Sequence, residues 1–231
     1  MAGKLYIVAT PIGNLEDLTF RVLRILKEVN LILCEDTRVT SILLRHYDIK
    51  KNTLSYHQKS DERKMAEILS YLIRGFDIAL VTDAGTPGIS DPGNELIEFI
   101  LRVRPFTGSD PSSDIRIIPV PGPSAITTAL SVSGMNVNKF VFLGFLPKKK
   151  RSKLFESLKF LKLPFAFYES PFRILKTLDV LADAFGEETK IFIARELTKI
   201  HETLYRGSIE KVREELGKEK VRGEIVVVVE L

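Results

Sequence analysis

Short segments made almost entirely of apolar residues recur along this chain, and longer segments with helical spacing separate them. In a sheet with one face in water, apolar and polar residues alternate, whereas strands covered on both faces are apolar throughout. The pattern therefore predicts an α/β fold with a largely parallel sheet covered by helices. Strands are expected at 5–9, 31–34, 78–81, 115–120, 164–168, 190–194, 202–205 and 224–230, and helices at 19–29, 39–47, 60–74, 93–102, 124–131, 151–162, 172–185 and 208–216.

The chain has 231 residues, of which 45% are hydrophobic, and this is enough to form the cores of two domains of ordinary size. We expect an N-terminal α/β domain over 1–143 and a C-terminal α/β domain over 144–231. Small-molecule sites often lie at such junctions. The polar segment 103–114, VRPFTGSDPSSD, is expected to be a surface loop.

Composition argues against several classes of protein. The longest apolar run, 225–229, is much shorter than the roughly 20 residues that cross a bilayer. No signal-peptide pattern precedes the first strand, so we expect a cytoplasmic protein with no membrane partner. The lone Cys34 cannot form an intrachain disulfide or a multi-cysteine zinc site, and we expect no metal. The net charge of +4 allows a polyanionic partner without requiring one.

Two loops rich in glycine and proline follow expected strands, at 82–93 (TDAGTPGISDPG) and at 121–125 (PGPSA). Glycine permits a close approach of the backbone to a ligand, and proline reduces the entropy lost on binding. Ligands of open α/β sheets bind at the carboxyl ends of the strands, and we expect these two strand ends to be adjacent. Because such loops present amides and carbonyls rather than charges, they suit a polar, zwitterionic ligand.

Other nucleotide-binding motifs are incomplete or absent. The turn after the first strand, TPIGN, has one glycine, whereas a dinucleotide-binding fold needs three to let a pyrophosphate approach. No GxxxxGK[ST] sequence occurs, which disfavours a nucleoside triphosphate.

Eight segments resemble a known family, and they occur in this order: VATPIGNLEDLTFR, LCEDTR, TDAGTPGISDPG, VPGPSAITTALSVSG, FLGFLP, FYESP, ARELTKIHE and RGEIVVVV. Over nearly the whole chain they resemble the ribosomal RNA methyltransferase branch of the tetrapyrrole methylase superfamily. The resemblance implies two α/β domains of the tetrapyrrole methylase type with S-adenosyl-L-methionine in the cleft between them. It also implies a homodimer that methylates the ribose 2′-O of a cytidine in the decoding region of 16S rRNA, in the small ribosomal subunit.

Carried over by motif, the resemblance implies that the cofactor meets Thr10, Pro11, Asp83, Ala84, Gly85, Ile89, Ser90, Ser124, Ala125, Tyr168, Ala194, Arg195, Gly223 and Glu224. The chain departs from the family at two places. The usual ESPHR reads ESPFR here, so Phe172 stands in place of the histidine and no catalytic histidine can act there. The loop at 103–114 is longer than usual in the family. The branch that the chain resembles lacks the GxGxGD loop of the tetrapyrrole-modifying members and has ATPIGNLED in its place, which argues against a porphyrinoid substrate.

Methyl transfer to a ribose hydroxyl requires alignment of the reactants and benefits from a general base. The candidate bases are Asp36, Glu35, Glu169, Glu196 and His57. Each of four has a structural role as its alternative: a helix cap for Asp36, a turn for Glu169 and an ion pair for Glu196. For His57 the alternative is an exposed position in a surface loop.

Two arginines, Arg38 and Arg195, are expected to position substrate phosphates, because guanidinium binds phosphate through two hydrogen bonds. A salt bridge is the alternative for each. The expected catalytic set is Asp36, Arg38, Glu169 and Arg195. A basic cluster is expected to attract the RNA backbone, with a solvated helix start as the alternative; it consists of Lys148, Lys149, Lys150, Arg151 and Lys153.

Two other functions stay open at this point. A small-molecule methyltransferase could use the same fold, although the missing GxGxGD loop disfavours it. A regulatory protein could keep the cofactor site without catalysis, and the ESPFR departure favours that alternative slightly.

Overall fold

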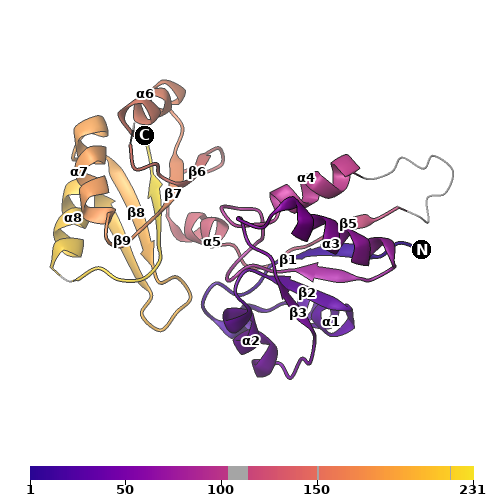
Figure 1. Ribbon diagram of the computed structural model, residues 1–231. Helices are drawn as coiled ribbons and strands as arrows, with labels where there is room; N and C mark the ends of the chain where they lie inside the picture. The colour runs from indigo at the N-terminus through magenta and orange to yellow at the C-terminus, as the bar shows by residue number, and fades with distance from the viewer. Residues whose placement is uncertain (104–113, 150, 219) are drawn as a thin grey trace. The chain divides into compact units, whose positions relative to one another are not determined.

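The structure is a computed structural model that describes residues 1–103, 114–149, 151–218 and 220–231. The chain forms two compact units, Met1–Ser124 and Ala125–Leu231 (Figure 1). The boundary expected between 143 and 144 lies later in the chain than this division. Helix α5 (Ala125–Val132) belongs to the second unit because it contacts strand β10 (Ile225–Val229). Residues 104–113 of the expected surface loop lie outside the described residues.

The first unit is built on a five-stranded sheet in the order β3-β2-β4-β1-β5. Its strands are β1 (Lys4–Val8), β2 (Leu31–Cys34), β3 (Thr53–Ser55), β4 (Ile78–Leu80) and β5 (Arg116–Val120). All of these strands pair in parallel, so their carboxyl ends meet at one edge of the sheet. The parallel sheet predicted from the apolar runs is confirmed for this unit. The apolar pattern missed β3, a three-residue edge strand.

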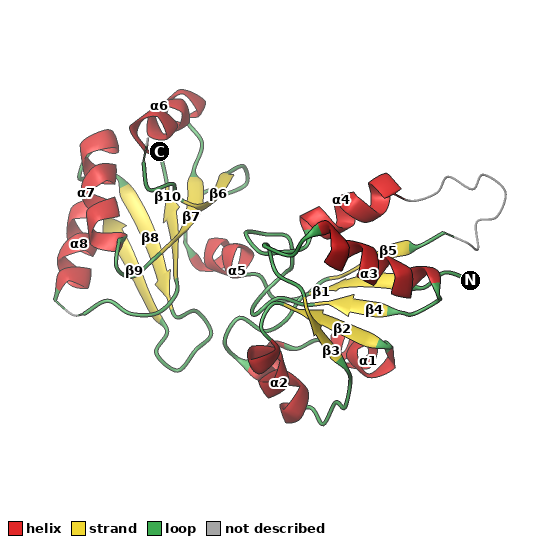
Figure 2. Ribbon diagram, in the orientation of Figure 1, coloured by secondary structure: helices red, strands yellow, loops and turns green. Residues whose placement is uncertain are grey.

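Helices cover both faces of this sheet (Figure 2). They are α1 (Phe20–Glu28), α2 (Thr37–His46), α3 (Glu62–Ile73) and α4 (Asn94–Val103), with a short 3-10 turn, η1 (Leu15–Asp17), after β1. Residues of α1 and α2, such as Leu26 and Leu43, form the core on one face. Residues of α3 and α4, such as Leu72 and Leu96, form the core on the other. Burial of each such side chain contributes about 1.5–3 kcal/mol to folding.

Side-chain caps set where three of these helices begin. Thr19 caps α1, Asp36 caps α2 and Asp61 caps α3, each by accepting a hydrogen bond from a backbone N–H of the first turn. Helix α4, expected from 93, begins at Asn94, and Asp91 and Pro92 lie in the turn that precedes it.

The second unit contains a mixed sheet in the order β6-β7-β10-β8-β9. Its other strands are β6 (Val141–Phe145), β7 (Phe165–Glu169), β8 (Lys190–Arg195) and β9 (Thr203–Ser208). β6 and β7 are parallel, but β10 runs antiparallel to β7 and β8, and β9 antiparallel to β8. The expectation of a largely parallel sheet is therefore wrong for this unit. An apolar strand such as β10, with all five residues buried, indicates burial on both faces rather than strand direction.

Three helices, α6 (Arg151–Leu161), α7 (Ile174–Phe185) and α8 (Ile209–Gly217), cover one face of the second sheet. Their apolar residues, including Phe155, Leu178 and Val212, form one core with alternate residues of the strands. Helix α5 lies on the opposite side of this sheet (Figure 1). Across the described ranges, no helix combines the length and the apolar character that a membrane span requires.

Candidate active site

The first group of predicted cofactor residues lies at the carboxyl edge of the first sheet. The expectation that the loops at 82–93 and 121–125 follow adjacent strands is wrong, because β1 lies between β4 and β5. Thr10, which follows β1, joins them: its N–H donates to the Gly85 carbonyl at 2.8 Å, and the Gly85 N–H donates back at 3.0 Å. The hydroxyl of Thr86 then reaches the Pro123 carbonyl at 3.0 Å. The two loops therefore meet across the end of β1.

Glycine is favoured at two points of this junction. Gly85 has a φ of +76°, and a Cβ there would lie 3.4 Å from Ile12 Cγ2. A Cβ at Gly122 would lie 3.1 Å from the Cβ of Ala9. Close backbone contacts therefore fix the shape of the junction before any ligand arrives.

The residues of this edge divide into those that hold the loop and those that it exposes. Thr10 is only 3% exposed, and its hydroxyl donates to the Thr82 carbonyl at 3.2 Å. Pro11 is also buried, so both residues support the edge more than they line it. In the loop at 82–93, Asp83, Ile89 and Ser90 are exposed and Ala84 is half-buried. Ser90 has a φ of +64°. Ser124 and Ala125, at the end of the loop at 121–125, are half-buried.

At the end of β2, Asp36 takes the structural role that was its alternative. Its carboxylate caps α2 and binds the Arg38 guanidinium twice, at 3.0 Å to Nε and 2.5 Å to Nη2. These hydrogen bonds lower the pKa of Asp36 from 3.8 to about 2, far from the neutral value that suits a general base. Asp36 as the base is therefore a poor fit. Arg38 keeps an 88% exposed side chain and can still meet an incoming phosphate.

Two further carboxyl groups at this edge behave differently. Burial, followed by the charge of Asp83, raises the pKa of Glu35. Burial also raises the pKa of Asp83, whose Oδ1 accepts the Asp36 N–H at 3.0 Å. Of the neighbours Glu35 and Asp36, Glu35 is the one whose pKa shifts towards neutrality.

Replacing Arg38 with leucine is expected to raise the pKa of Asp36 from about 2 towards 3.8, because the largest cause of the depression is lost. A depressed pKa stabilises the folded chain above the unfolded value of about 3.9. That contribution disappears as the pH falls through about 2, the folded pKa of Asp36. A carbon-13 NMR titration of the carboxyl group measures the change, and equal values in both proteins would mean that the ion pair does not form in solution.

The second group of predicted cofactor residues lies at one edge of the second sheet. Val226 of β10 is the register partner of both Tyr168 on β7 and Ala194 on β8. Because β10 runs antiparallel to both strands, its first residues lie at their carboxyl ends. Gly223 and Glu224 therefore lie beside the ends of β7 and β8, as a shared site would require.

The segment after β8 is held in a strained conformation by this edge. Glu196 and Thr198 have φ values of +53° and +66°, which non-glycine residues rarely adopt. Glu196 Oε1 accepts from the Glu224 N–H at 2.8 Å and from Lys199 Nζ at 2.9 Å, and Lys199 also binds Glu224 Oε2 at 3.0 Å. A Cβ at Gly223 would lie 2.3 Å from Glu196 Cδ, so only glycine fits there.

This ion pair confirms the structural alternative for Glu196. Burial opposes ionisation of its carboxyl group, but the hydrogen bonds from Lys199 and Glu224 outweigh it and lower the pKa. The neighbouring Arg195 binds the Thr203 hydroxyl at 2.9 Å through Nη2. Within the described part of the chain, its buried Nε has no hydrogen-bond partner. Arg195 thus retains an unused donor for a ligand.

Glu169 is the clearest correction to the expected catalytic set. Its side chain is 0% exposed, and it accepts hydrogen bonds from the Thr177 hydroxyl at 2.7 Å and the Ser170 N–H at 2.8 Å. It also forms two ion pairs: Arg173 Nε lies 3.1 Å from Glu169 Oε1, and Arg151 Nη2 lies 3.7 Å from Glu169 Oε2. A carboxylate with these partners cannot reach a substrate hydroxyl, so its role is structural.

The same ion pair removes Arg151 from the expected basic cluster. Its side chain is 13% exposed, and its guanidinium donates to Thr177 Oγ1 and to the Pro147 carbonyl, both at 2.8 Å. Lys148, Lys149 and Lys153 are exposed as expected. Lys150 lies outside the described residues.

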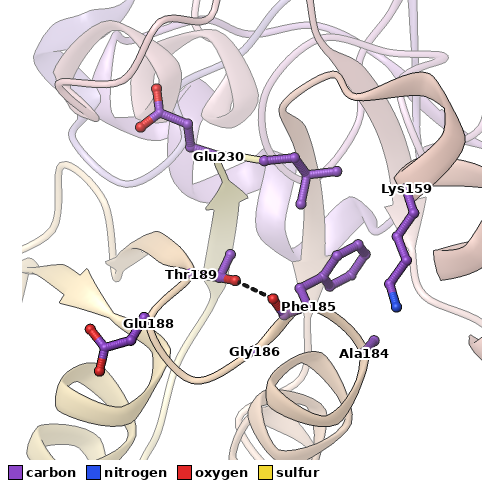
Figure 3. A pocket seen from close by; sticks show the side chains of 8 residues that line it. Lys159, Ala184, Phe185, Gly186, Glu188, Thr189 and Glu230 are labelled. Carbon is purple, nitrogen blue, oxygen red and sulfur yellow. Dashed lines mark hydrogen bonds between the residues drawn. The ribbon is translucent and has the colours of Figure 1, made fainter.

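His57 also belongs to the carboxyl edge of the first sheet, because it follows β3 and its charge acts on Glu35. It is exposed there, and its Nδ1 accepts the Lys59 N–H at 3.2 Å. An open hollow of about 590 Å³ in the second unit is lined by α6, the turn after α7 and the chain end, including Lys159, Phe185 and Glu230 (Figure 3). Because Val229 pairs with Phe165 at the start of β7, this hollow lies at the sheet edge opposite to Glu169. In the described ranges, His, Cys, Asp and Glu side chains form no cluster of three that could hold a metal.

Comparison with known proteins shows the family of this chain. The family model for tetrapyrrole (corrin/porphyrin) methylases matches residues 4–213, and the chain belongs to this family. A curated relative from Thermotoga maritima, named ribosomal RNA small subunit methyltransferase I, is 46% identical and aligns over 98% of this chain and 97% of its own. A relative of the same name from Hydrogenobaculum is 45% identical and aligns over 97% and 94%.

Solved structures support the fold alone. The methyltransferase CobJ superposes with a TM-score of 0.73 at 18% identity, over 99% of this chain and 94% of its own. A uroporphyrin-III-C-methyltransferase from Thermus thermophilus has a TM-score of 0.64 at 19% identity, over 100% and 93%. The predicted α/β class and tetrapyrrole methylase type are thus confirmed.

The residues exposed at the first edge fit S-adenosylmethionine, the cofactor that this family uses. The cofactor combines an ammonium and a carboxylate with an apolar base. Asp83 offers a negative charge, the loop backbone offers amides and carbonyls, and Ile89, 42% exposed, offers an apolar contact. This mixture suits a zwitterion better than a polyanion.

Proposed function

We propose that this protein is an S-adenosylmethionine-dependent methyltransferase that modifies the ribose 2′-O of a cytidine in the decoding region of 16S rRNA. The observation that carries the proposal is the closed junction of Thr10, Gly85 and Pro123, which forms a rigid cofactor edge in a chain 46% identical to a small-subunit rRNA methyltransferase. We also propose that it acts as a homodimer in the cytoplasm, where its substrate is.

The cofactor supplies a methyl group on a positively charged sulfur, so the protein need only bind, align and manage one proton. Asp83, Ala84 and Gly85 would bind the methionyl part, with Ile89 and Ser90 next to it, and Ser124 and Ala125 beyond. Predicted contacts from the second unit involve Tyr168, Ala194, Arg195, Gly223 and Glu224. Alignment alone can lower such a barrier by roughly 7–11 kcal/mol.

The proton of the ribose hydroxyl requires an acceptor, and we assign this role to Glu35. Its pKa is raised, whereas Asp36 is held near pKa 2 by Arg38 and Glu196 is engaged by Lys199. Arg38 and Arg195 would bind the phosphates beside the target ribose, since the side chain of Arg38 is 88% exposed and the Nε of Arg195 has no hydrogen-bond partner among the described residues.

Methyl transfer to small ribosomal subunits tests the proposal. Purified protein is incubated with methyl-labelled cofactor and subunits that lack the modification. Label in a cytidine 2′-O position is the expected result. Cofactor binding without any transfer would support the regulatory alternative, and failure to bind the cofactor would contradict the assignment altogether.

A further inference from the structure

The second unit exposes aromatic and basic side chains together at the carboxyl ends of β6 and β7. Phe172, in the turn before α7, is 91% exposed, and Phe145, the last residue of β6, is 60% exposed. Lys148 and Lys149 follow Phe145 by a few residues and are exposed as well. We call these four residues the aromatic-basic edge. Single exposed apolar residues are ordinary, so the argument depends on how this edge is held.

Phe172 is presented by a turn with little freedom. Its N–H donates to the Ser170 hydroxyl at 3.3 Å, and the N–H groups of Arg173 and Ile174 donate to the Ser170 carbonyl at 2.9 and 3.1 Å. The ends of the turn are anchored by the buried Glu169 through its ion pair with Arg173. Because the backbone of this turn is fixed, only the side-chain torsions of Phe172 lose freedom on binding, which favours the use of the ring as a contact surface.

The same buried carboxylate fixes the basic part of the edge. Arg173 Nη2 donates to the Leu146 carbonyl at 2.8 Å, and Arg151 Nε donates to the Pro147 carbonyl at 2.8 Å. Both arginines pair with Glu169, so Lys148 and Lys149 follow directly after a segment tied to the Phe172 turn. The parallel pairing of β6 with β7 brings Phe145 to the same edge, where its ring lies 5.5 Å from that of Tyr168.

We propose that the aromatic-basic edge binds an unpaired segment of the RNA substrate, with a base stacked on Phe172 and phosphates held by Lys148 and Lys149. Proteins bind single-stranded RNA by this combination of exposed rings and cations. An apolar protein partner would not account for the two lysines, and a duplex would not offer a free base face to the ring. The inference rests on the proposed function for the identity of the RNA, but the binding mode can be tested separately.

Binding of one short RNA, measured as a single strand and as a perfect duplex, tests this mode. Phe172→Ala is expected to weaken single-strand binding by about 5- to 150-fold and to leave duplex binding unchanged, because stacking needs an unpaired base. Phe172→Tyr should restore the affinity. Lys149→Gln should weaken both forms and reduce the salt dependence by about 0.7 per lost charge on the single strand.

Phe160 provides the matched control, because it is 87% exposed and has Lys159 and Lys162 as close neighbours in the chain. It lies near the other end of α6, about 14 Å along the helix from Arg151. Phe160→Ala should leave RNA binding unchanged. Equal losses from Phe160→Ala and Phe172→Ala would overturn the proposal, as would an unchanged single-strand affinity in Phe172→Ala. If Phe172→Ala instead dissociates a dimer in sedimentation velocity with RNA affinity intact, the edge is a subunit contact and the proposal is wrong.

Methyl transfer to the small ribosomal subunit, run in parallel, separates this inference from the proposed function. If the Phe172→Ala variant transfers methyl groups at the wild-type rate and with an unchanged KM, only the stacking role is contradicted. If the wild-type protein transfers no methyl group but still binds RNA in a way that depends on Phe172, only the proposed function is contradicted.

Discussion

Replacing Glu169 with alanine is expected to lower the free energy of unfolding by about 3–5 kcal/mol. The side chain is 0% exposed and pairs with Arg151 and Arg173, so its removal leaves two guanidinium groups without their counter-charge inside the second unit. The Thr177 hydroxyl also loses the oxygen that it binds at 2.7 Å. Urea unfolding of the full chain measures the effect.

Glu187→Ala is the matched control for this loss. Glu187 also pairs with an arginine, Arg213, at 3.1 Å, but its side chain is 52% exposed. Exposed ion pairs contribute about 0–1 kcal/mol. A Glu169→Ala protein as stable as the Glu187→Ala protein would show that the Glu169 ion pairs do not hold β7, α6 and α7 together.

Replacing Gly85 with valine should weaken S-adenosylmethionine binding by roughly 100-fold or more. A β-branched residue at φ +76° is strained by about 1–3 kcal/mol, and its Cβ would lie 3.4 Å from Ile12 Cγ2. Relief of that strain breaks the paired hydrogen bonds with Thr10, each of which contributes about 1 kcal/mol. A loop that has lost these bonds no longer presents its amides and carbonyls to the cofactor, and a 100-fold change in affinity corresponds to roughly 2.8 kcal/mol. Isothermal titration calorimetry with the cofactor measures it.

Gly134→Val separates backbone strain from the binding effect. Gly134 has a φ of +73°, nearly that of Gly85, but a Cβ there meets nothing within 4 Å. The variant should lose some stability and keep its cofactor affinity. If Gly85→Val binds the cofactor as tightly as Gly134→Val does, the loop at 82–93 is not the cofactor edge.

The sequence predicts the existence of both edges well, because the features that mark them are local. Apolar runs locate most of the strands, although not β3 or β6, and the glycines and prolines of 82–93 follow directly after β4. The order of the strands is not a local property. That β1 lies between β4 and β5, and that Thr10 therefore joins the two loops, follows from pairing between distant segments.

The roles of the charged residues were harder to predict for a related reason. Glu169 follows four strand residues that are largely apolar and precedes Arg173 by four positions, a spacing that could have indicated a buried ion pair. Nothing local connects it with Arg151 or Thr177, which meet it only in the folded unit. In contrast, the capping role of Asp36 follows from its position just before a helix, and that alternative was available from sequence.

The most direct test of the cofactor assignment is a crystal structure of the protein with S-adenosylmethionine bound. We expect the methionyl group against the backbone of Asp83, Ala84 and Gly85, with the sulfonium methyl left accessible to an incoming ribose. Cofactor bound elsewhere, for instance in the hollow beside Lys159 and Phe185, with the loop at 82–93 empty, would contradict the account.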